Sequence, residues 1–169
     1  IQGNTITEAG EPVGMWYVLQ TDGLFQSEAE IQGYTSSDGT VIQPDAQPGD
    51  IRFRDINDDG MITNSDKIVD SSPWPDFEMG WNASAEYKGF DFSMNWIGSF
   101  GATVYNGFRS TVDRFDDDTN YRAGIQPWTP ENPNTDFPRV VKASTMNARG
   151  DSDRWLEDGS FVRLKYIGF

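Results

Sequence analysis

The stretch of sequence that decides the fold is Phe77-Glu78-Met79-Gly80-Trp81-Asn82-Ala83-Ser84-Ala85-Glu86-Tyr87. All of its odd positions are apolar or aromatic, and all of its even positions are polar or glycine. Successive side chains of a strand point to opposite faces of its sheet. The alternation therefore predicts a β-strand that has one apolar face and one polar face.

A second strand is predicted directly after the first. The two-residue link Lys88-Gly89 is suited to a hairpin turn. The residues from Phe90 to Gly98 alternate again, with Ile97 as the exception. We therefore predict a β-hairpin over residues 77–98.

The other elements are predicted from shorter sequence patterns. Residues 160–169 predict a further strand, in which Ile167 breaks the alternation. Residues 10–75 and 101–159 are predicted to be long loops, and the second of them has no clean period and is rich in Asp, Asn, Pro and Thr. The first loop is expected to be partly structured, with short strands at Met15–Leu19 and Ile51–Arg54. About two helical turns are expected at Gln26–Gly33, because Ser27 is a suitable N-cap and Glu30 follows it three residues later.

The predicted fold class is all-β. Each hairpin strand has about the 9–11 residues that cross a bilayer at a tilt. Aromatic residues lie at both ends of the hairpin, as in the two aromatic girdles of a membrane barrel: Trp74, Phe77, Trp96 and Phe100 at one end, Tyr87 and Phe90 at the other. The pattern predicts antiparallel strands of a large transmembrane β-barrel with long extracellular loops, of which this chain is a fragment. A hairpin in a soluble β-sandwich explains the alternation equally well.

Composition excludes several classes of function. The 169 residues include 13 Lys and Arg against 27 Asp and Glu, a net charge of −14, and no His or Cys. The absence of His and Cys excludes Ser-His and Cys-His catalytic pairs and the usual zinc sites. A charge of −14 argues against nucleic acid as a partner, because neutralising phosphates requires a basic surface.

The strongest chemical motif is a candidate calcium loop over residues 55–66. Counted from Asp55, oxygen-bearing side chains fall at positions 1, 3 and 5, and Gly60 falls at position 6, where the backbone must turn sharply. Ile62 at position 8 is expected to anchor the loop. The predicted ligands of a structural calcium ion, or of magnesium as the alternative, are Asp55, Asn57, Asp59, the Met61 carbonyl, Thr63 and Asp66. A turn without an ion remains the competing interpretation.

Three weaker sequence features can be explained by either a structural or a functional role. The acidic run Asp113–Asp118 fits a solvated loop better than a second metal site. Trp128 could stack on a ligand such as a sugar, or pack its loop against the rest of the protein. Arg154 is expected at a junction between a loop and a strand, with its charged end reaching toward water.

Taken in order, six segments resemble the C-terminal part of the SusC/RagA family of TonB-dependent outer-membrane transporters of Bacteroidetes. They are Gly10–Gly14, Asp22–Gln26, Pro48–Gly60, Tyr87–Phe92, Trp128–Pro133 and Arg154–Lys165. Together they span nearly the whole chain. Nothing in the chain resembles the plug domain or the segment that contacts TonB.

The resemblance implies energy-coupled import of glycans or peptides across the outer membrane, without catalytic residues. It implies as partners a SusD-like surface lipoprotein, the remainder of the barrel with its plug, and TonB through segments outside this chain. Short turns of such barrels face the periplasm, so both long loops are expected to be extracellular. Two other functions stay open: a soluble, calcium-stabilised, glycan-binding β-domain, and a hydrolase that uses paired carboxylates.

Overall fold

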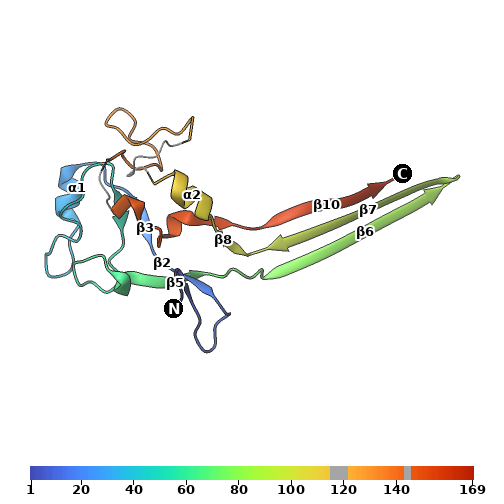
Figure 1. Cartoon of the computed structure of the whole chain (residues 1–169), viewed down its shortest axis with the longest axis horizontal. Coiled ribbons are helices and arrows are strands. Elements are labelled where there is room, and N and C mark those ends of the chain that lie inside the picture. The colour runs from blue at the N-terminus through green and yellow to red at the C-terminus, as the bar shows by residue number, and fades with distance from the viewer. Residues whose placement is uncertain (115–121, 143–145) are drawn as a thin grey trace. The chain divides into compact units, whose positions relative to one another are not determined.

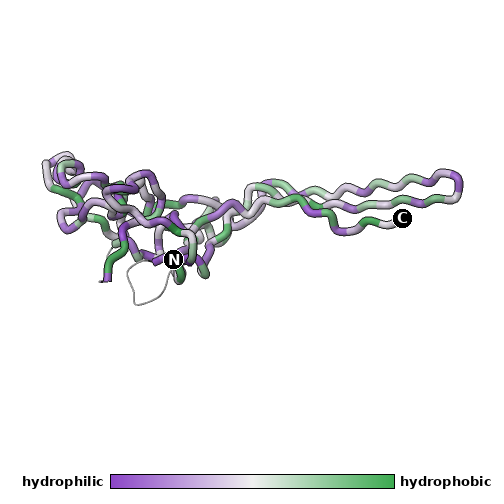
Figure 2. Tube along the Cα trace, turned by 90° about the horizontal axis from the view of Figure 1, so that it is seen from above, coloured by the Kyte–Doolittle hydropathy of each residue, from purple (hydrophilic) through white to green (hydrophobic). Residues whose placement is uncertain are grey.

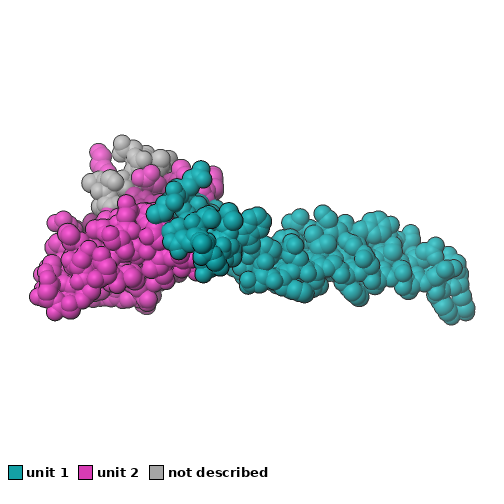
Figure 3. Space-filling view, turned by 90° about the horizontal axis from the view of Figure 1, so that it is seen from below, with its two compact units in different colours: residues 1–16, 71–105, 156–169 teal, residues 17–70, 106–155 magenta. Residues whose placement is uncertain are grey.

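A computed structural model describes residues 1–114, 122–142 and 146–169 of the chain (Figure 1). The chain divides into two compact units, shown in Figure 3. Unit 1 comprises residues 1–16, 71–105 and 156–169, and unit 2 comprises residues 17–70 and 106–155. No helix in the described part of the chain combines the length and the apolar composition that crossing a membrane requires.

Unit 1 is built on a long antiparallel sheet, which confirms the predicted strands. Strands β6 (Phe77–Tyr87) and β7 (Phe90–Phe100) form the hairpin, and β10 (Phe161–Gly168) pairs with the other side of β7, giving the order β10-β7-β6. Lys88 and Gly89 link the first two strands with φ angles of 49° and 85°. Positive φ at both central residues is the requirement of a type I′ turn, whose twist matches that of a hairpin.

The register of the hairpin separates an apolar face from a polar face, with Ile97, opposite Gly80, as the exception on the polar face. Apolar residues lie opposite one another, as in the pairs Trp81–Trp96 and Ala83–Met94. Polar residues face each other on the opposite side, as in the pair Ser84–Ser93. Figure 2 shows the same alternation of hydropathy along the two strands.

A β-bulge in β10 explains the interrupted alternation of the third strand. Leu164 pairs with Trp96, whereas Tyr166 pairs with the next residue of β7, Asn95. The extra residue of the bulge changes the phase of the strand. Ile167 therefore lies opposite Met94 and rejoins the apolar face, so the residue that breaks the sequence pattern keeps the face continuous.

Several short elements complete the two units. Their bounds are β1 (Thr5–Ile6), β2 (Met15–Leu19), β3 (Thr21–Leu24), α1 (Glu28–Gly33), β4 (Ile51–Phe53), η1 (Asn64–Asp66), β5 (Lys67–Ser71), β8 (Thr103–Tyr105), α2 (Gly107–Val112), η2 (Met146–Ala148), η3 (Asp153–Trp155) and β9 (Leu156–Asp158). The sheets have the orders β1-β2-β5, β3-β4 and β8-β9. The predicted strands at 15–19 and 51–54 are confirmed as β2 and β4, and Ser27 caps α1 by accepting a hydrogen bond from the Glu30 N–H at 3.3 Å.

The stretch 101–159 is more ordered than a long loop, because it contains β8, α2, η2, η3 and β9. Each of these elements is six residues or shorter. A periodic pattern needs a longer window to stand out, so elements of this length leave no signal in the sequence.

The core of unit 2 lies beside β4. Leu19, Ile51 and Phe53 form its buried cluster, against which Leu24, Ile62 and Met146 pack. Next to this cluster the buried Asp50 carboxylate accepts hydrogen bonds from the Arg139 guanidinium at 2.6 and 3.1 Å and from the Asn147 side-chain amide at 2.8 Å. The Asn147 side-chain oxygen in turn accepts the Ile51 backbone N–H at 2.9 Å. This network joins Arg139 and Asn147, in the second half of unit 2, to Asp50 and to β4 in its first half.

Trp128 packs within unit 2 and donates a hydrogen bond from its indole N–H to the Gln26 side chain at 2.9 Å. A Cβ atom added to Gly49 would lie 2.4 Å from the Trp128 ring, and Gly49 has a φ of +91°. These contacts favour the packing role that the sequence left open for Trp128.

Gly49→Ala is expected to destabilise unit 2 more than Gly39→Ala does. Both glycines have positive φ, near +90°, but an added Cβ at Gly39 would meet nothing within 4 Å. Backbone strain should cost about 1–2 kcal/mol at each site, and overlap with Trp128 about 1–3 kcal/mol more at Gly49. Thermal unfolding followed by tryptophan fluorescence measures the difference. Equal losses at both sites would contradict the close packing.

Candidate functional site

The predicted calcium loop, residues 55–66, folds as a tight turn in unit 2. Asp58 and Gly60 have φ angles of 59° and 80°, so the chain reverses sharply where the spacing requires it. Gly60 is buried, and a Cβ atom there would lie 3.0 Å from the Thr40 side chain. A glycine at this position therefore serves both the backbone conformation and the packing of the loop.

The first three predicted ligands lie on one turn. Asp55 accepts hydrogen bonds from the Gly60 N–H at 2.8 Å and from the Asp59 N–H at 3.3 Å. The Asn57 side-chain oxygen accepts from the Asp59 N–H at 3.1 Å, and an Asp59 oxygen accepts from the Met61 N–H at 3.0 Å. Each carboxylate or amide oxygen has two lone pairs. The turn thus orients Asp55, Asn57 and Asp59 while leaving acceptor capacity for a further ligand.

The last two predicted ligands have a structural role. Asp66 is fully buried, and its oxygens accept the backbone N–H groups of Ile56, Asn57 and Thr63 at 3.0, 3.4 and 2.7 Å. The Thr63 hydroxyl accepts the Ser65 N–H at 3.1 Å, and Thr63 and Asp66 form a capping box at the start of η1, in which each side chain accepts the backbone N–H of the other. Asp66 therefore ties the beginning of the loop to its end.

The loop matches the needs of a bound cation only in part. Among the described residues, no group of three or more acidic, His or Cys side chains is arranged to hold a metal ion. Asp55, Asn57 and Asp59 supply the hard oxygen ligands that calcium prefers. Both oxygens of Asp66 accept backbone N–H groups, as do both oxygens of Asp55, but Asp66 is fully buried whereas Asp55 is only partly so. Binding of one ion by the full predicted set stays a prediction.

The surroundings of the loop keep its acidic neighbours ionised. Hydrogen bonds from Ser36 and Thr40 lower the pKa of Asp38 to about 2, and hydrogen bonds from Ser37 lower the pKa of Asp58. Beyond η1, Asp151 pairs with Lys67 at 2.8 Å and with Arg149 at 2.7 Å. The hydrogen bond from Arg149 holds the pKa of Asp151 well below its usual range.

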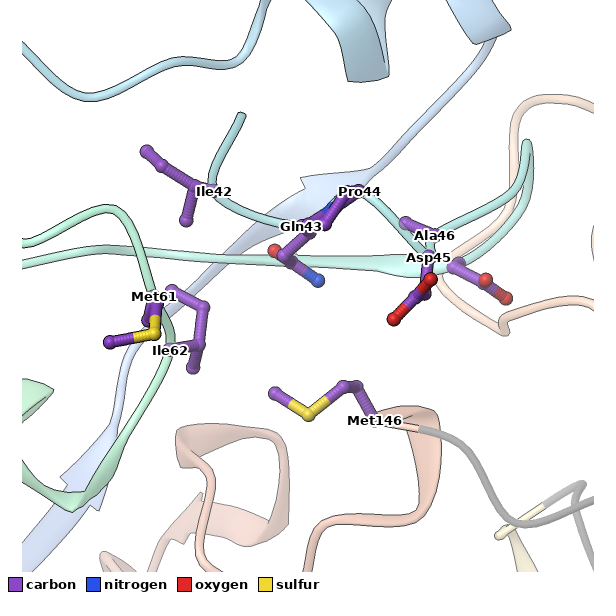
Figure 4. A pocket seen from close by; sticks show the side chains of 9 residues that line it. Ile42, Gln43, Pro44, Asp45, Ala46, Met61, Ile62 and Met146 are labelled. Carbon is purple, nitrogen blue, oxygen red and sulfur yellow. The ribbon is translucent and has the colours of Figure 1, made fainter. Parts of the chain in front are cut away.

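A cavity of about 450 Å³ adjoins the loop in unit 2. Figure 4 shows Met61 and Ile62 of the loop on one side of this space and Met146 on another. The remaining lining residues are Ile42, Gln43, Pro44, Asp45, Ala46 and Asp50. Ile62 also packs against the core cluster, which confirms its predicted anchoring role. Sequence reasoning missed the cavity because its walls come from three separate segments.

The acidic run 113–118 begins with a structural residue. Asp113 is fully buried and accepts hydrogen bonds from the Arg122 guanidinium at 2.9 and 2.6 Å. It also forms a salt bridge with Arg109 at 3.4 Å. These partners neutralise the one acid of the run that the structure describes. Asp116, Asp117 and Asp118 lie outside the described residues.

Comparisons with known proteins agree on one family. The chain is 33% identical over 98% of its length to the TonB-dependent receptor P26 of Formosa agariphila, and 32% identical over 83% of its length to the TonB-dependent receptor SusC of Bacteroides thetaiotaomicron. It spans 16% and 14% of these relatives, respectively. No family model matches the chain.

A solved structure of the RagAB peptide transporter shares the fold. It superposes on 98% of this chain with a TM-score of 0.69 at 18% identity, and the chain covers 16% of that protein. The predicted fold class, antiparallel strands of a barrel-type receptor, is thereby confirmed for this fragment. The resemblance to the SusC/RagA family is confirmed as well.

Asp66→Asn is expected to destabilise the loop by about 2–3 kcal/mol, because a neutral amide replaces a charged acceptor of buried backbone N–H groups. The matched control is Asp70→Asn, an exposed position in β5 that should change stability by about 0.5 kcal/mol or less. Hydrogen exchange of the Ile56 and Thr63 amides reports the effect directly. Unchanged protection in the Asp66→Asn variant would refute the anchoring role.

Proposed function

Because the chain is homologous to a segment of SusC/RagA-type TonB-dependent receptors, we propose that it forms part of the barrel wall and the extracellular loops of an outer-membrane importer. The observation that carries the proposal is the sheet β10-β7-β6. Its apolar face is continuous through Met79–Gly98, Trp81–Trp96 and Ala83–Met94, and Trp81 remains 51% exposed. Lipid is the environment that covers such a face at a low energetic cost.

The edges of the same sheet support a barrel. Strands β6 and β10 each have a neighbour on one side only within the described residues. An unpaired strand of eleven residues in water is a template for aggregation. Closure with further strands on both sides satisfies these edges, and a closed barrel is the β-structure that can span a membrane.

Cargo and partners follow from the named relatives. RagAB is a peptide transporter by its description, so we propose import of peptides or glycans, driven through TonB by segments outside this chain. A SusD-like surface lipoprotein is the proposed partner of the loops, and the plug and the rest of the barrel are the proposed partners of the sheet. Covalent chemistry is not part of this proposal.

The short turn at Lys88-Gly89 sets the proposed orientation. Barrels of this type keep their short turns in the periplasm and their long connections outside the cell. Unit 2, which contains the calcium-type loop, would then be extracellular. We also propose that this loop binds one calcium ion through Asp55, Asn57, Asp59 and the Met61 carbonyl, completed by Thr63 and Asp66, so that the cation relieves repulsion among the carboxylates.

Ala83→Arg should destabilise the receptor by about 2–4 kcal/mol, whereas Ser84→Arg should be tolerated, since a charge on the lipid face is costly near mid-bilayer. The two positions are adjacent in β6 but belong to opposite faces. Heat-modifiable migration of the receptor in detergent and its level in the outer membrane measure the effect. Equal tolerance would favour a soluble domain.

Orientation is tested with introduced cysteines, since the chain has none. Asp45→Cys in unit 2 should react with a membrane-impermeant maleimide on intact cells. Lys88→Cys in the hairpin turn should react only after the outer membrane is opened. The reverse pattern would overturn the proposed orientation.

Asp59→Ala should abolish calcium binding to the loop and raise its sensitivity to protease, with β6, β7 and β10 remaining folded. Asp58→Ala is the matched control, because position 4 of the loop is not a predicted ligand. Isothermal calorimetry of the receptor measures calcium binding. An unmodified receptor that binds no calcium, or an Asp59→Ala variant that binds as much calcium as Asp58→Ala, would leave the loop as an ion-free turn.

A further inference from the structure

A second pocket, of about 280 Å³, lies in unit 2 away from the calcium-type loop. Its lining comes from β3, β4, α2 and η3, and from the segment that contains Thr135 and Asp136. The charged residues in its wall are Arg109, Arg154 and Asp136. Thr21, Gly23, Leu24, Ile51 and Thr135 complete the wall.

Arg154 brings unused hydrogen-bond donors to this pocket. The residue is half-buried, and its guanidinium lies over the Trp155 ring at 4.9 Å. Its hydrogen bond to the Asn147 carbonyl is long, at 3.4 Å, and in the described part of the chain no carboxylate forms an ion pair with it. A guanidinium has five N–H donors. Burial, with a contribution from nearby Arg109, lowers the pKa of Arg154 to about 10, so it is cationic at neutral pH.

Asp136 brings the opposite charge to the same pocket. It is exposed, and within the described residues it has neither a hydrogen bond nor an ion pair. Arg109 is already paired with Asp113 at 3.4 Å. The hydroxyls of Thr21 and Thr135 already donate to Asp153 and to the Gln126 carbonyl. The pocket therefore presents one cationic and one anionic group that form no ion pair with each other, although the charges of Asp136, Asp113 and Asp153 act on Arg154.

The geometry points to a binding site for a small zwitterion, a free amino acid or a short peptide. Its carboxylate would bind the Arg154 guanidinium, and its ammonium group would bind the Asp136 carboxylate. Arg is suited to this role, because its planar fork matches a carboxylate with two parallel hydrogen bonds. The volume lies just below the usual range of ligand pockets, so the site takes one or two residues rather than a long chain.

This inference names a substrate class and in that respect rests on the proposed import function. The binding chemistry of the pocket can nevertheless be tested without transport. The probe is L-alanyl-L-alanine, titrated into the purified full-length receptor in detergent and followed by calorimetry. N-acetyl-L-alanine keeps the carboxylate without the ammonium group, and L-alaninamide keeps the ammonium group without the carboxylate.

The dipeptide should bind at least about tenfold more tightly than either analogue, a difference of ~1.4 kcal/mol. Asp136→Asn should weaken the dipeptide to the level of N-acetyl-L-alanine and leave that analogue unchanged. Arg154→Gln should abolish binding of both. Asp45→Asn is the matched control, because Asp45 lines the other cavity and should leave affinity unchanged. Asp136 is exposed, so its variant keeps the proposal testable if Arg154→Gln does not fold.

Two results would overturn the site: no binding of the dipeptide at millimolar concentration, or binding of glucuronate as tight as that of the dipeptide. An uptake assay separates this failure from failure of the proposed function. Peptide uptake that is unaffected by Asp136→Asn would remove the site and leave the importer. Dipeptide binding that depends on Arg154 and Asp136 in a receptor that takes up neither peptides nor glycans would support the site and remove the importer.

Discussion

An apolar sheet face that nothing in the described chain covers is the constraint on which the rest of unit 1 depends. Burying an aromatic or large aliphatic side chain contributes about 1.5–3 kcal/mol, and β6 leaves Phe77, Trp81 and Tyr87 more than half exposed. A three-stranded sheet of this kind is poorly stable in water by itself. Its sequence is therefore adapted to an environment that supplies the missing apolar contact.

Unit 2, in contrast, encloses an apolar cluster of its own and is further stabilised by buried polar groups. Asp50 joins Arg139 and Asn147 to the backbone of β4, and Asp66 joins both ends of the calcium-type loop. Buried carboxylates are costly unless they are fully hydrogen-bonded, and here each accepts several donors. The loops of this unit thus have a defined conformation although they contain little regular secondary structure.

The sequence allowed the sheet to be predicted because a strand pattern is local. The alternation at 77–87, the Lys88-Gly89 turn and the cap at Ser27 each depend on residues next to one another in the chain. The bulge before Tyr166 was not predictable, because its register depends on pairing with β7. The Asp50 network joins residues about 90 positions apart, and no local pattern encodes such a contact.

The candidate site shows the same division. The spacing of Asp55, Asn57, Asp59 and Gly60 encodes a turn, and the structure contains that turn. The spacing did not distinguish a ligand from a structural acceptor at Asp66, because that difference depends on burial. The pocket that contains Arg154 and Asp136 left no motif at all, since its charges meet only after folding. Arg154 forms no ion pair within the described residues, although the charges of Asp113, Asp136 and Asp153 act on it, because these carboxylates lie beyond direct contact with its guanidinium.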